Sequence, residues 1–414
     1  MSRSLHKPMS DTVVVVGGGA AGLMAATQAA RQGHTVLLLE RGEKLGKKIY
    51  ITGKGRCNVT NLCTPEAFMR NVVRNPKFLF SALRALPPQK LIELLRELGC
   101  PTTVERGNRV FPVSQKASDV TRAFTRAIES LGVQVRLNAR VKELLTADGA
   151  ITGVALESGE TIAARAVIVC TGGVSYPTTG STGDGYELLQ ALGHTMAVPK
   201  AALCGLISED AWIRSLQGLS LKNVRLNLWD GKKHLMGEIG EMLFTHRGIS
   251  GPLVLTASSL MAGRKGLQLA LDLKPGLTEE QLDARLLRDL ADAGKKQMIT
   301  ILRGLYPGDL ATIMAQLADI SPQLPACELP KAARQRLVSL TKALPLPVTG
   351  AEPIETAVIT AGGADVKEFN PSTMESKLVK GLYAAGEVLD VDALTGGFNL
   401  HIAFCTGYLA ASSL

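Results

Sequence analysis

The sequence predicts a three-layer α/β fold with a doubly wound parallel sheet, into which a β-rich domain and a helical subdomain are inserted. Two apolar runs, 12–16 and 35–39, flank a helical stretch of small residues over 20–32. Apolar runs of this length are typical of parallel strands buried on both faces. A third run, 166–170, leads into a glycine-rich loop. Together they predict a β-α-β unit and a further strand of the same sheet.

The stretch between the second and third strands changes character along the chain. Residues 91–131 have a largely helical pattern, which a turn-rich stretch over 100–112 interrupts. From 133 to 168 apolar residues alternate, and the pairs Asp148-Gly149 and Ser158-Gly159 break the alternation. This pattern is typical of a β-meander with tight turns.

The second half first resembles an insertion and then returns to the main domain. Short strand-like pieces over 194–273 are followed by leucine-rich helical patterns over 278–344. A strand over 381–385 and an apolar helix over 399–411 end the chain. We therefore expect four segments: the first part of the main domain (1–193), a β-rich inserted substrate domain (194–276), a helical subdomain of the insert (277–345) and the second part of the main domain (346–414).

Composition narrows the class of protein. With 414 residues, 46% of them hydrophobic and 20% charged, the chain has ordinary globular proportions. Its seven cysteines contain no C-x-x-C pair, which argues against a zinc site and a redox-active dithiol, and we expect no metal. Glycines and polar residues interrupt the apolar stretch 13–30, so we expect no membrane span, no secretory signal and a cytoplasmic location.

The glycine-rich turn after the first strand carries the clearest functional signal. Its residues, Gly17-Gly18-Gly19-Ala20-Ala21-Gly22, fit the dinucleotide-binding pattern G-x-G-x-x-G in a strand-turn-helix context. Gly17 allows the tight turn, Gly19 lets the backbone approach a pyrophosphate, and Gly22 permits close packing of helix on strand. The helix N-terminus favours phosphate, and Glu40 at the end of the second strand is placed to bind a ribose.

Later features favour FAD over NAD as the nucleotide. Thr171-Gly172-Gly173 follows strand 166–170, and Gly386-Glu387 follows strand 381–385, where FAD proteins of the glutathione-reductase type return to the cofactor. Glu387 would accept hydrogen bonds from ribitol hydroxyls. Gly396-Gly397-Phe398-Asn399 would begin a helix aimed at the N1 edge of the flavin, where it would stabilise negative charge on the reduced ring.

The net charge of +9 allows an anionic partner, but the positive residues are dispersed. The densest run lies beside the glycine turn, where dinucleotide phosphates account for it: Lys44, Lys47, Lys48, Lys54 and Arg56. Nucleic acid is therefore not the expected partner. The alternative is a positive face on the helical subdomain, formed by Arg285, Arg288, Lys295, Lys296, Arg303, Lys331, Arg334 and Arg336.

Several stretches resemble the BaiN/YhiN-like flavoproteins, in order along most of the chain: 47–61, 179–185, 243–252, 360–363, 370–377 and 386–392. The resemblance implies a Rossmann-like FAD-binding domain formed from both ends of the chain, a β-rich insert and a helical subdomain. Members have been linked to enone reduction on steroid-like compounds and to amine oxidation. The resemblance therefore does not choose a substrate.

The resemblance also implies the residues of the cofactor site. The loop 53–58 should lie against the flavin, with Arg56 and Asn58 either as polar contacts or as braces of the loop. The complete expected set is Gly17, Gly19, Ala20, Ala21, Gly22, Glu40, Arg41, Lys48, Thr52, Gly53, Gly55, Arg56, Cys57, Asn58, Val141, Thr171, Gly172, Gly173, Gly386, Glu387, Gly396, Gly397, Phe398 and Asn399.

The catalytic candidates are His401, Arg56 and Asn58. His401 stands where glutamine is more usual among the similar flavoproteins, so it is either a proton donor suited to neutral pH or a structural histidine. Cys57 is expected to pack rather than react, because no histidine or resolving cysteine is near in sequence. Further candidates, each with packing as the alternative, are Tyr176, His246 and Ser250.

We predict an FAD-dependent oxidoreductase that transfers hydride between a small organic substrate and flavin N5. No second G-x-G-x-x-G follows Glu40, so we expect no dedicated NAD(P)H domain. Either NAD(P)H binds transiently over the flavin as the electron donor, or oxygen is the acceptor, or the substrate itself supplies and takes the hydride. The alternatives are an amine oxidase that uses O2 and an RNA-associated or redox-sensing flavoprotein without turnover.

Overall fold

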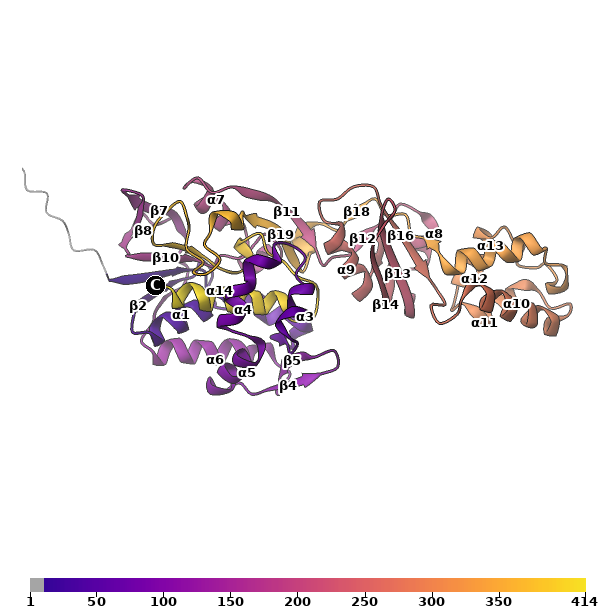
Figure 1. The fold of residues 1–414 in the computed structure, drawn as a ribbon, viewed down its shortest axis with the longest axis horizontal. Helices are drawn as coiled ribbons and strands as arrows, with labels where there is room; N and C mark the ends of the chain where they lie inside the picture. Colours follow the sequence, from indigo (N-terminus) through magenta and orange to yellow (C-terminus); the bar gives the residue numbers. More distant parts are fainter. Residues whose placement is uncertain (1–10) are drawn as a thin grey trace, which may run out of the picture. The chain divides into compact units, whose positions relative to one another are not determined.

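The computed structural model describes residues 11–414, which divide into two compact units. The first comprises the chain up to Ala202 together with Pro353–Leu414, and the second comprises Leu203–Glu352. Each unit has its own hydrophobic core. Early and late parts of the chain therefore build the first unit together, and Figure 1 shows helix α14, near the C-terminus, beside α1.

A parallel sheet lies at the centre of the first unit, in the order β20-β10-β1-β2-β6. Its strands are β1 (Thr12–Val16), β2 (Thr35–Leu39), β6 (Gln134–Arg136), β10 (Ala166–Val169) and β20 (Leu382–Ala384). The expected α/β class is confirmed. The expectation for 134–136 is wrong: this segment pairs with β2 at the sheet edge and is not part of the meander.

Helices α1 (Ala20–Arg31) and α14 (Phe398–Ser412) pack closely in this unit. A Cβ on Gly407 would lie 2.4 Å from the carbonyl oxygen of Ala21, so only glycine permits this approach of the two backbones. The other helices are α2 (Lys47–Ile51), α3 (Pro65–Arg70), α4 (Phe80–Ala85), α5 (Pro88–Glu97), α6 (Ala117–Ser130) and α7 (Asp184–Gln190).

Three small antiparallel sheets complete the first unit. The predicted meander is β7 (Val141–Ala147), β8 (Ala150–Leu156) and β9 (Thr161–Ala163). The turn-rich stretch before α6 is a hairpin, β4 (Thr102–Glu105) and β5 (Arg109–Pro112), with β3 (Thr60–Asn61) paired to β5. Strand β11 (Met196–Ala202) pairs with β19 (Ile359–Ala364).

The second unit combines a seven-stranded sheet with helices around one core. The order β17-β16-β13-β14-β15-β12-β18 centres on the long hairpin of β13 (Ser220–Asp230) and β14 (Lys233–Thr245). The other strands are β12 (Leu206–Ile207), β15 (Gly248–Ser250), β16 (Leu267–Asp272), β17 (Leu344–Pro345) and β18 (Gly350–Ala351). The helices are α8 (Ala211–Ser215), α9 (Pro252–Met261), α10 (Glu279–Ala293), α11 (Met298–Leu305), α12 (Leu310–Leu317) and α13 (Lys331–Lys342).

Among residues 11–414, no helix combines the length and the apolar character that crossing a bilayer requires. All seven cysteines are free thiols, and most are buried. Within the same described range, no group of histidine, cysteine and acidic side chains is arranged to hold a metal ion.

Candidate active site

Three glycine-containing turns follow the carboxyl ends of three adjacent parallel strands, β20, β10 and β1. They are Gly17–Gly19 after β1, Thr171–Gly173 after β10 and Gly386 after β20. Carboxyl ends of neighbouring parallel strands meet at one edge of a sheet, which is where open α/β sheets bind ligands. The fold therefore brings the three predicted turns to one place.

The first turn is built as a phosphate cradle. Gly17 has φ 101°, and a Cβ on Gly22 would lie 1.8 Å from the carbonyl oxygen of Gly17, so both positions require glycine. Gly19 precedes α1 without a side-chain cap, and a Cβ there would meet no atom within 4 Å. The free amides of Ala20, Ala21 and the rest of the first helical turn thus border open space, which suits a pyrophosphate.

Glu40 is fixed at the end of β2. One carboxylate oxygen accepts a hydrogen bond from the amide of Gly18 at 2.7 Å, and the other accepts from the amide of Gly42 at 2.7 Å. The residue is 8% exposed. Because each carboxylate oxygen has further lone pairs, the side chain is oriented and can still accept ribose hydroxyls.

A network of ion pairs begins at Arg41, the residue after Glu40. Arg41 donates to Asp184 at 2.8 Å, and Arg140 donates to both oxygens of Asp184 at 3.0 and 3.1 Å. Arg140 directly precedes Val141, whose side chain is buried at the start of β7. The network thus ties the segment after β2 to β7 and to the first turn of α7. Sequence reasoning missed Arg140 and Asp184, because their pairing joins segments far apart in the chain.

Glu387 forms the other polar wall of the cradle. Lys48 donates to it at 2.7 Å and also to the hydroxyl of Ser175 at 2.7 Å. The Ser175 hydroxyl and the amide of Thr360 in turn donate to the second oxygen of Glu387, at 3.2 and 2.7 Å. The structure therefore brings the predicted pair Lys48 and Glu387 together. It adds Ser175 and Thr360, which no sequence motif had assigned to the site.

The turn after β10 is packed against the same wall. Gly172 has φ 76°, and a Cβ on Gly173 would lie 2.4 Å from the hydroxyl oxygen of Thr360. That hydroxyl accepts from the amides of Val174 and Ser175 at 2.9 and 3.1 Å. Glycine at 173 thus lets the chain pass close to β19.

Four buried polar atoms without a partner gather in this region, among the residues that the structure describes. They are the hydroxyls of Thr171 and Tyr186 and one carboxylate oxygen each of Asp390 and Asp392. Tyr186 lies within electrostatic range of Glu387 and Asp390, and Asp392 within range of the same two acids. Buried polar groups normally have partners. A hydroxyl-rich polar ligand or its waters would supply them here.

The loop 52–58 has an unusual backbone. It begins with a 3-10 turn, Thr52–Gly55, and φ is positive at Gly53, Lys54, Gly55 and Cys57. Cys57 is fully buried, and burial raises the pKa of its thiol to about 12. It therefore remains a thiol and packs, as expected.

Arg56 and Asn58 both brace this loop. Arg56 donates to Gln115 at 2.5 Å, pairs with Glu105, and lies over the Phe111 ring with its guanidinium carbon 4.1 Å from the centroid. The side-chain oxygen of Asn58 accepts from the amide of Val110 at 3.2 Å. Both residues thus connect the loop to the β4–β5 hairpin and the segment after it.

The N-terminus of α14 begins at a second uncapped glycine. Gly397 has φ 98°, and a Cβ there would lie 2.4 Å from the carbonyl oxygen of Thr60 and 2.8 Å from the side-chain oxygen of Asn58. Asn399 binds both backbone groups of Ala393 at 2.6 and 2.8 Å and so pins the loop that contains Gly396. The amides of Phe398 and its neighbours are left available at the positive end of the helix dipole.

His401 lies inside the protein rather than at a site surface. It is 0% exposed, its Nδ1 is 3.0 Å from the Thr60 hydroxyl, and its Nε2 donates to the carbonyl of Leu86 at 3.0 Å. Burial lowers its pKa to about 4, so the ring is neutral at physiological pH. This environment favours the structural alternative, in which His401 joins β3, α14 and the end of α4.

Three further candidates remain, one in the first unit and two in the second. Tyr176 follows the turn after β10 with φ 51°, and its amide donates to the carbonyl of Glu355 at 3.2 Å. His246 and Ser250 belong to the second unit: His246 lies in the turn between β14 and β15, and Ser250 is the last residue of β15.

An FAD molecule fits the chemistry of these residues. The uncapped α1 N-terminus suits its pyrophosphate, Glu40 a ribose, the Glu387 wall its ribitol hydroxyls, and the α14 N-terminus an electron-rich ring edge. The fold and this cradle define an FAD-dependent oxidoreductase. A family model described as the HI0933-like protein Rossmann domain matches residues 11–413, and the chain belongs to that family.

Three similar proteins align with nearly the whole chain. The 3-dehydro-bile acid delta(4,6)-reductase of Clostridium scindens is 31% identical over 97% of this chain and 98% of its own length. The ribosomal RNA dihydrouridine synthase of Haemophilus influenzae is also 31% identical, over the same shares. Its namesake from Escherichia coli is 30% identical over 97% of each protein.

Solved structures share the fold at low sequence identity. The FrdA subunit of Escherichia coli quinol fumarate reductase superposes with a TM-score of 0.51 at 17% identity, over 97% of this chain and 70% of that one. A 3-ketosteroid delta1-dehydrogenase from Sterolibacterium denitrificans has a TM-score of 0.51 at 15% identity, over 97% and 99%. These likenesses support the architecture of the FAD-binding fold.

Proposed function

We propose that the protein reduces a carbon–carbon double bond conjugated to a carbonyl group, with FAD as the hydride carrier and NAD(P)H as the transient donor. The uncapped N-terminus of α14 carries the proposal, because its amides suit an electron-rich, reduced flavin. The relatives' names support the reaction class. A 3-dehydro-bile acid delta(4,6)-reductase and a ribosomal RNA dihydrouridine synthase, by their names, both saturate a ring double bond conjugated to a carbonyl.

The protein's share of this chemistry is binding, orientation and electrostatics. When bound, FAD supplies a hydride at N5 to the β-carbon, and a proton must reach the α-carbon. The two turns after β1 and β10 hold the nucleotide in place, and Lys48 orients the Glu387 carboxylate by donating a hydrogen bond to it. The α14 N-terminus offsets negative charge at the flavin edge. Cys57 and His401 are unsuited to deliver the proton, because one is a buried thiol and the other a buried neutral ring.

A turnover assay with matched substrates tests this function. The purified yellow protein is mixed with NADH or NADPH and a cyclic enone, and the product is identified by mass spectrometry. The saturated ketone serves as the blank, and benzylamine with O2 tests the oxidase alternative. We expect the enone to gain two hydrogens while nicotinamide is consumed. Amine oxidation without enone reduction would overturn the proposal.

A uracil ring within RNA is the second candidate substrate, and one surface favours it. Phe80 is 65% exposed, and Lys77 and Arg84 lie one helical turn before and after it. Neither cation has an ion-pair partner in the described part of the chain. An exposed aromatic ring between free cations suits a stacked base and its phosphates.

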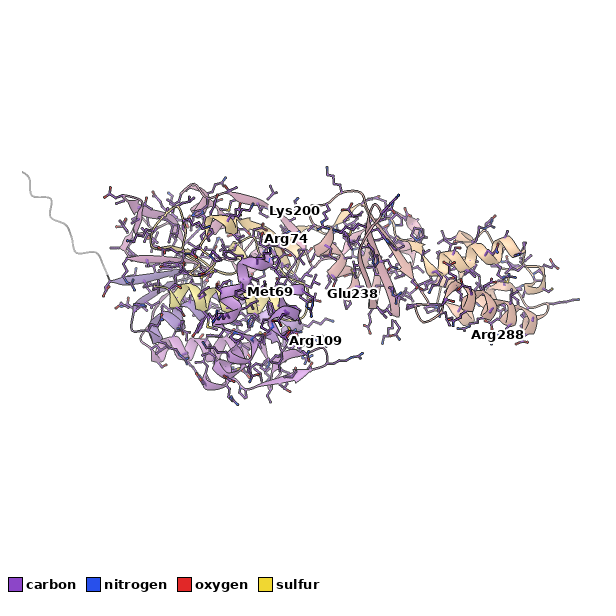
Figure 2. All side chains as sticks on the ribbon, in the orientation of Figure 1. Met69, Arg74, Arg109, Lys200, Glu238 and Arg288 are labelled. Atoms are coloured by element: carbon purple, nitrogen blue, oxygen red, sulfur yellow. The ribbon has the colours of Figure 1, made fainter. Side chains whose placement is uncertain are left out.

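The helical subdomain is less suited to RNA than expected from its arginine and lysine residues, because several of the arginines are paired with aspartates. Arg334 pairs with Asp283 at 2.7 Å, Arg285 with Asp289 at 3.6 Å and Arg336 with Asp319 at 3.6 Å. Arg288, labelled in Figure 2, is exposed on α10.

A double variant of the Phe80 surface tests RNA binding. We expect K77Q/R84Q to weaken RNA binding about tenfold or more and to flatten its salt dependence. The double variant R285Q/R288Q is the control and should change neither.

A further inference from the structure

A cavity of about 360 Å³ lies in the first unit between the end of α5, residues 113–114 and α6. Its wall includes Leu98, Cys100, Pro101, Val113, Arg122 and Arg126. None of these residues belongs to the cradle described above. The cavity is therefore a second concave site on the FAD-binding unit.

The cavity lining combines apolar side chains with two arginines of α6. Cys100 and Ala123 are buried at its base, whereas Val113 is 57% exposed to it and to solvent. Arg122 and Arg126 lie one turn apart on α6, where like charges repel. Arg122 is paired with Asp119 at 3.0 Å, but Arg126 has no ion-pair partner among residues 11–414. The cavity therefore retains one uncompensated positive charge beside apolar surface.

Two features relate this cavity to the loop 52–58, a hydrogen bond and an electrostatic effect. The wall residues Val113 and Ser114 lead directly into Gln115, which has φ 58°. Gln115 accepts from Arg56 at 2.5 Å and donates to Glu105 at 3.2 Å. A ligand that moves Val113 would therefore move the residue that holds Arg56.

The second feature is the position of Cys100 in the cavity lining. Cys100 lies within electrostatic range of Cys57, and both thiols are buried. Packed interiors transmit small displacements because they contain few voids. The cavity is thus linked to the loop by the Gln115–Arg56 hydrogen bond, and Cys100 of its lining lies near enough to Cys57 to act on it electrostatically.

We propose that this cavity is an effector site for a small organic monoanion with a compact apolar body, such as a short-chain carboxylate. The free guanidinium of Arg126 binds the anionic group, and the apolar floor holds the body. Occupancy displaces the 113–115 segment, and Arg56 carries the change to the loop 52–58. The site goes beyond the proposed reaction, since its ligand is neither substrate nor cofactor.

The test titrates the purified FAD-loaded protein with hexanoate, inorganic phosphate and 1-hexanol. Binding is measured by calorimetry, and the flavin absorption spectrum is recorded in parallel. We expect saturable binding of hexanoate with a change in the spectrum, and much weaker binding of the other two. Phosphate binding as tightly as hexanoate would contradict the apolar part of the site, and hexanol binding as tightly would contradict the anionic part.

Three variants separate binding from coupling. Arg126→Gln should weaken hexanoate binding roughly tenfold to a hundredfold, since a charge-assisted contact is lost. Arg96→Gln, an exposed arginine of α5 outside the lining, is the matched control and should bind as the parent does. Gln115→Ala should bind hexanoate but lose the spectral response. Equal binding by Arg126→Gln and the parent, or no saturable binding by the parent, would overturn the proposal.

Discussion

At the scale of single residues, two glycines of the same turn differ in what a methyl group would meet. A Cβ on Gly22 would collide with the Gly17 carbonyl, whereas a Cβ on Gly19 would point into open space with an ordinary φ of −78°. Gly22 is thus required by the fold, and Gly19 by whatever occupies the space in front of it.

We therefore predict opposite phenotypes for the two alanine variants. Gly22→Ala should lose about 3 kcal/mol or more of unfolding free energy, because a backbone clash must be relieved. Gly19→Ala should keep its stability without FAD but bind FAD roughly a hundredfold more weakly. Urea unfolding of the FAD-free protein and FAD titration measure the two effects. Unchanged FAD affinity in Gly19→Ala would contradict the cradle.

His401 provides a pH test at the same scale. Its folded pKa is about 4 and its ordinary value is 6.5, so protons bind the unfolded state more readily between these pH values. The contribution of the neutral His401 ring to the free energy of unfolding is fully present above pH 6.5. It is lost as the pH falls towards 4, and the total loss is roughly 3 kcal/mol. His401→Gln should show a flatter dependence of unfolding free energy over this window. An equal slope in both proteins would refute the assignment.

At the scale of elements, the start of α14 depends on Gly397. An alanine there would meet the Thr60 carbonyl and require φ 98°, so the first turn of the helix must shift. We expect Gly397→Ala to lower the flavin midpoint potential by roughly 20 mV, because about 1 kcal/mol of dipole stabilisation of the reduced ring is lost. Spectroelectrochemistry measures it.

A helix of the other unit supplies the control for that variant. Thr278 forms a capping box with Gln281 at the start of α10, so Thr278→Ala should cost about 1 kcal/mol of stability. Its flavin potential should equal that of the parent. A potential shift in Thr278→Ala as large as in Gly397→Ala would show that general destabilisation, and not the dipole, sets the potential.

Local patterns predicted the elements that carry the cradle. The apolar runs predicted both ends of β1 and β2 correctly. The glycine turn and the final helix also lie where the spacing indicated. The sequence could not reveal the β4–β5 hairpin, since its strands are short and Gly107 with Asn108 lies in a turn-rich stretch. Nor could it reveal that Arg56 is held by Gln115 and Glu105, because that contact depends on the tertiary fold.

At the scale of the whole molecule, the second unit is a continuous insertion whose two ends are joined. The amide of Glu352 donates to the carbonyl of Gly205 at 2.9 Å. Replacing 203–352 by a short glycine-serine linker should therefore leave the first unit folded and yellow, since its core contains no residue of the insert. We expect FAD affinity within about tenfold of the parent, measured by FAD titration. A colourless, unfolded product would contradict the division into units.

The central claim, that bound FAD reduces a conjugated double bond, is tested most directly by a single turnover without oxygen. The flavin is reduced anaerobically with one equivalent of dithionite, and a cyclic enone or a uridine-containing RNA is then added. We predict that the oxidised flavin spectrum returns without oxygen, with one saturated product formed per flavin. A flavin that stays reduced with both substrates and is reoxidised only when air is admitted would contradict the account.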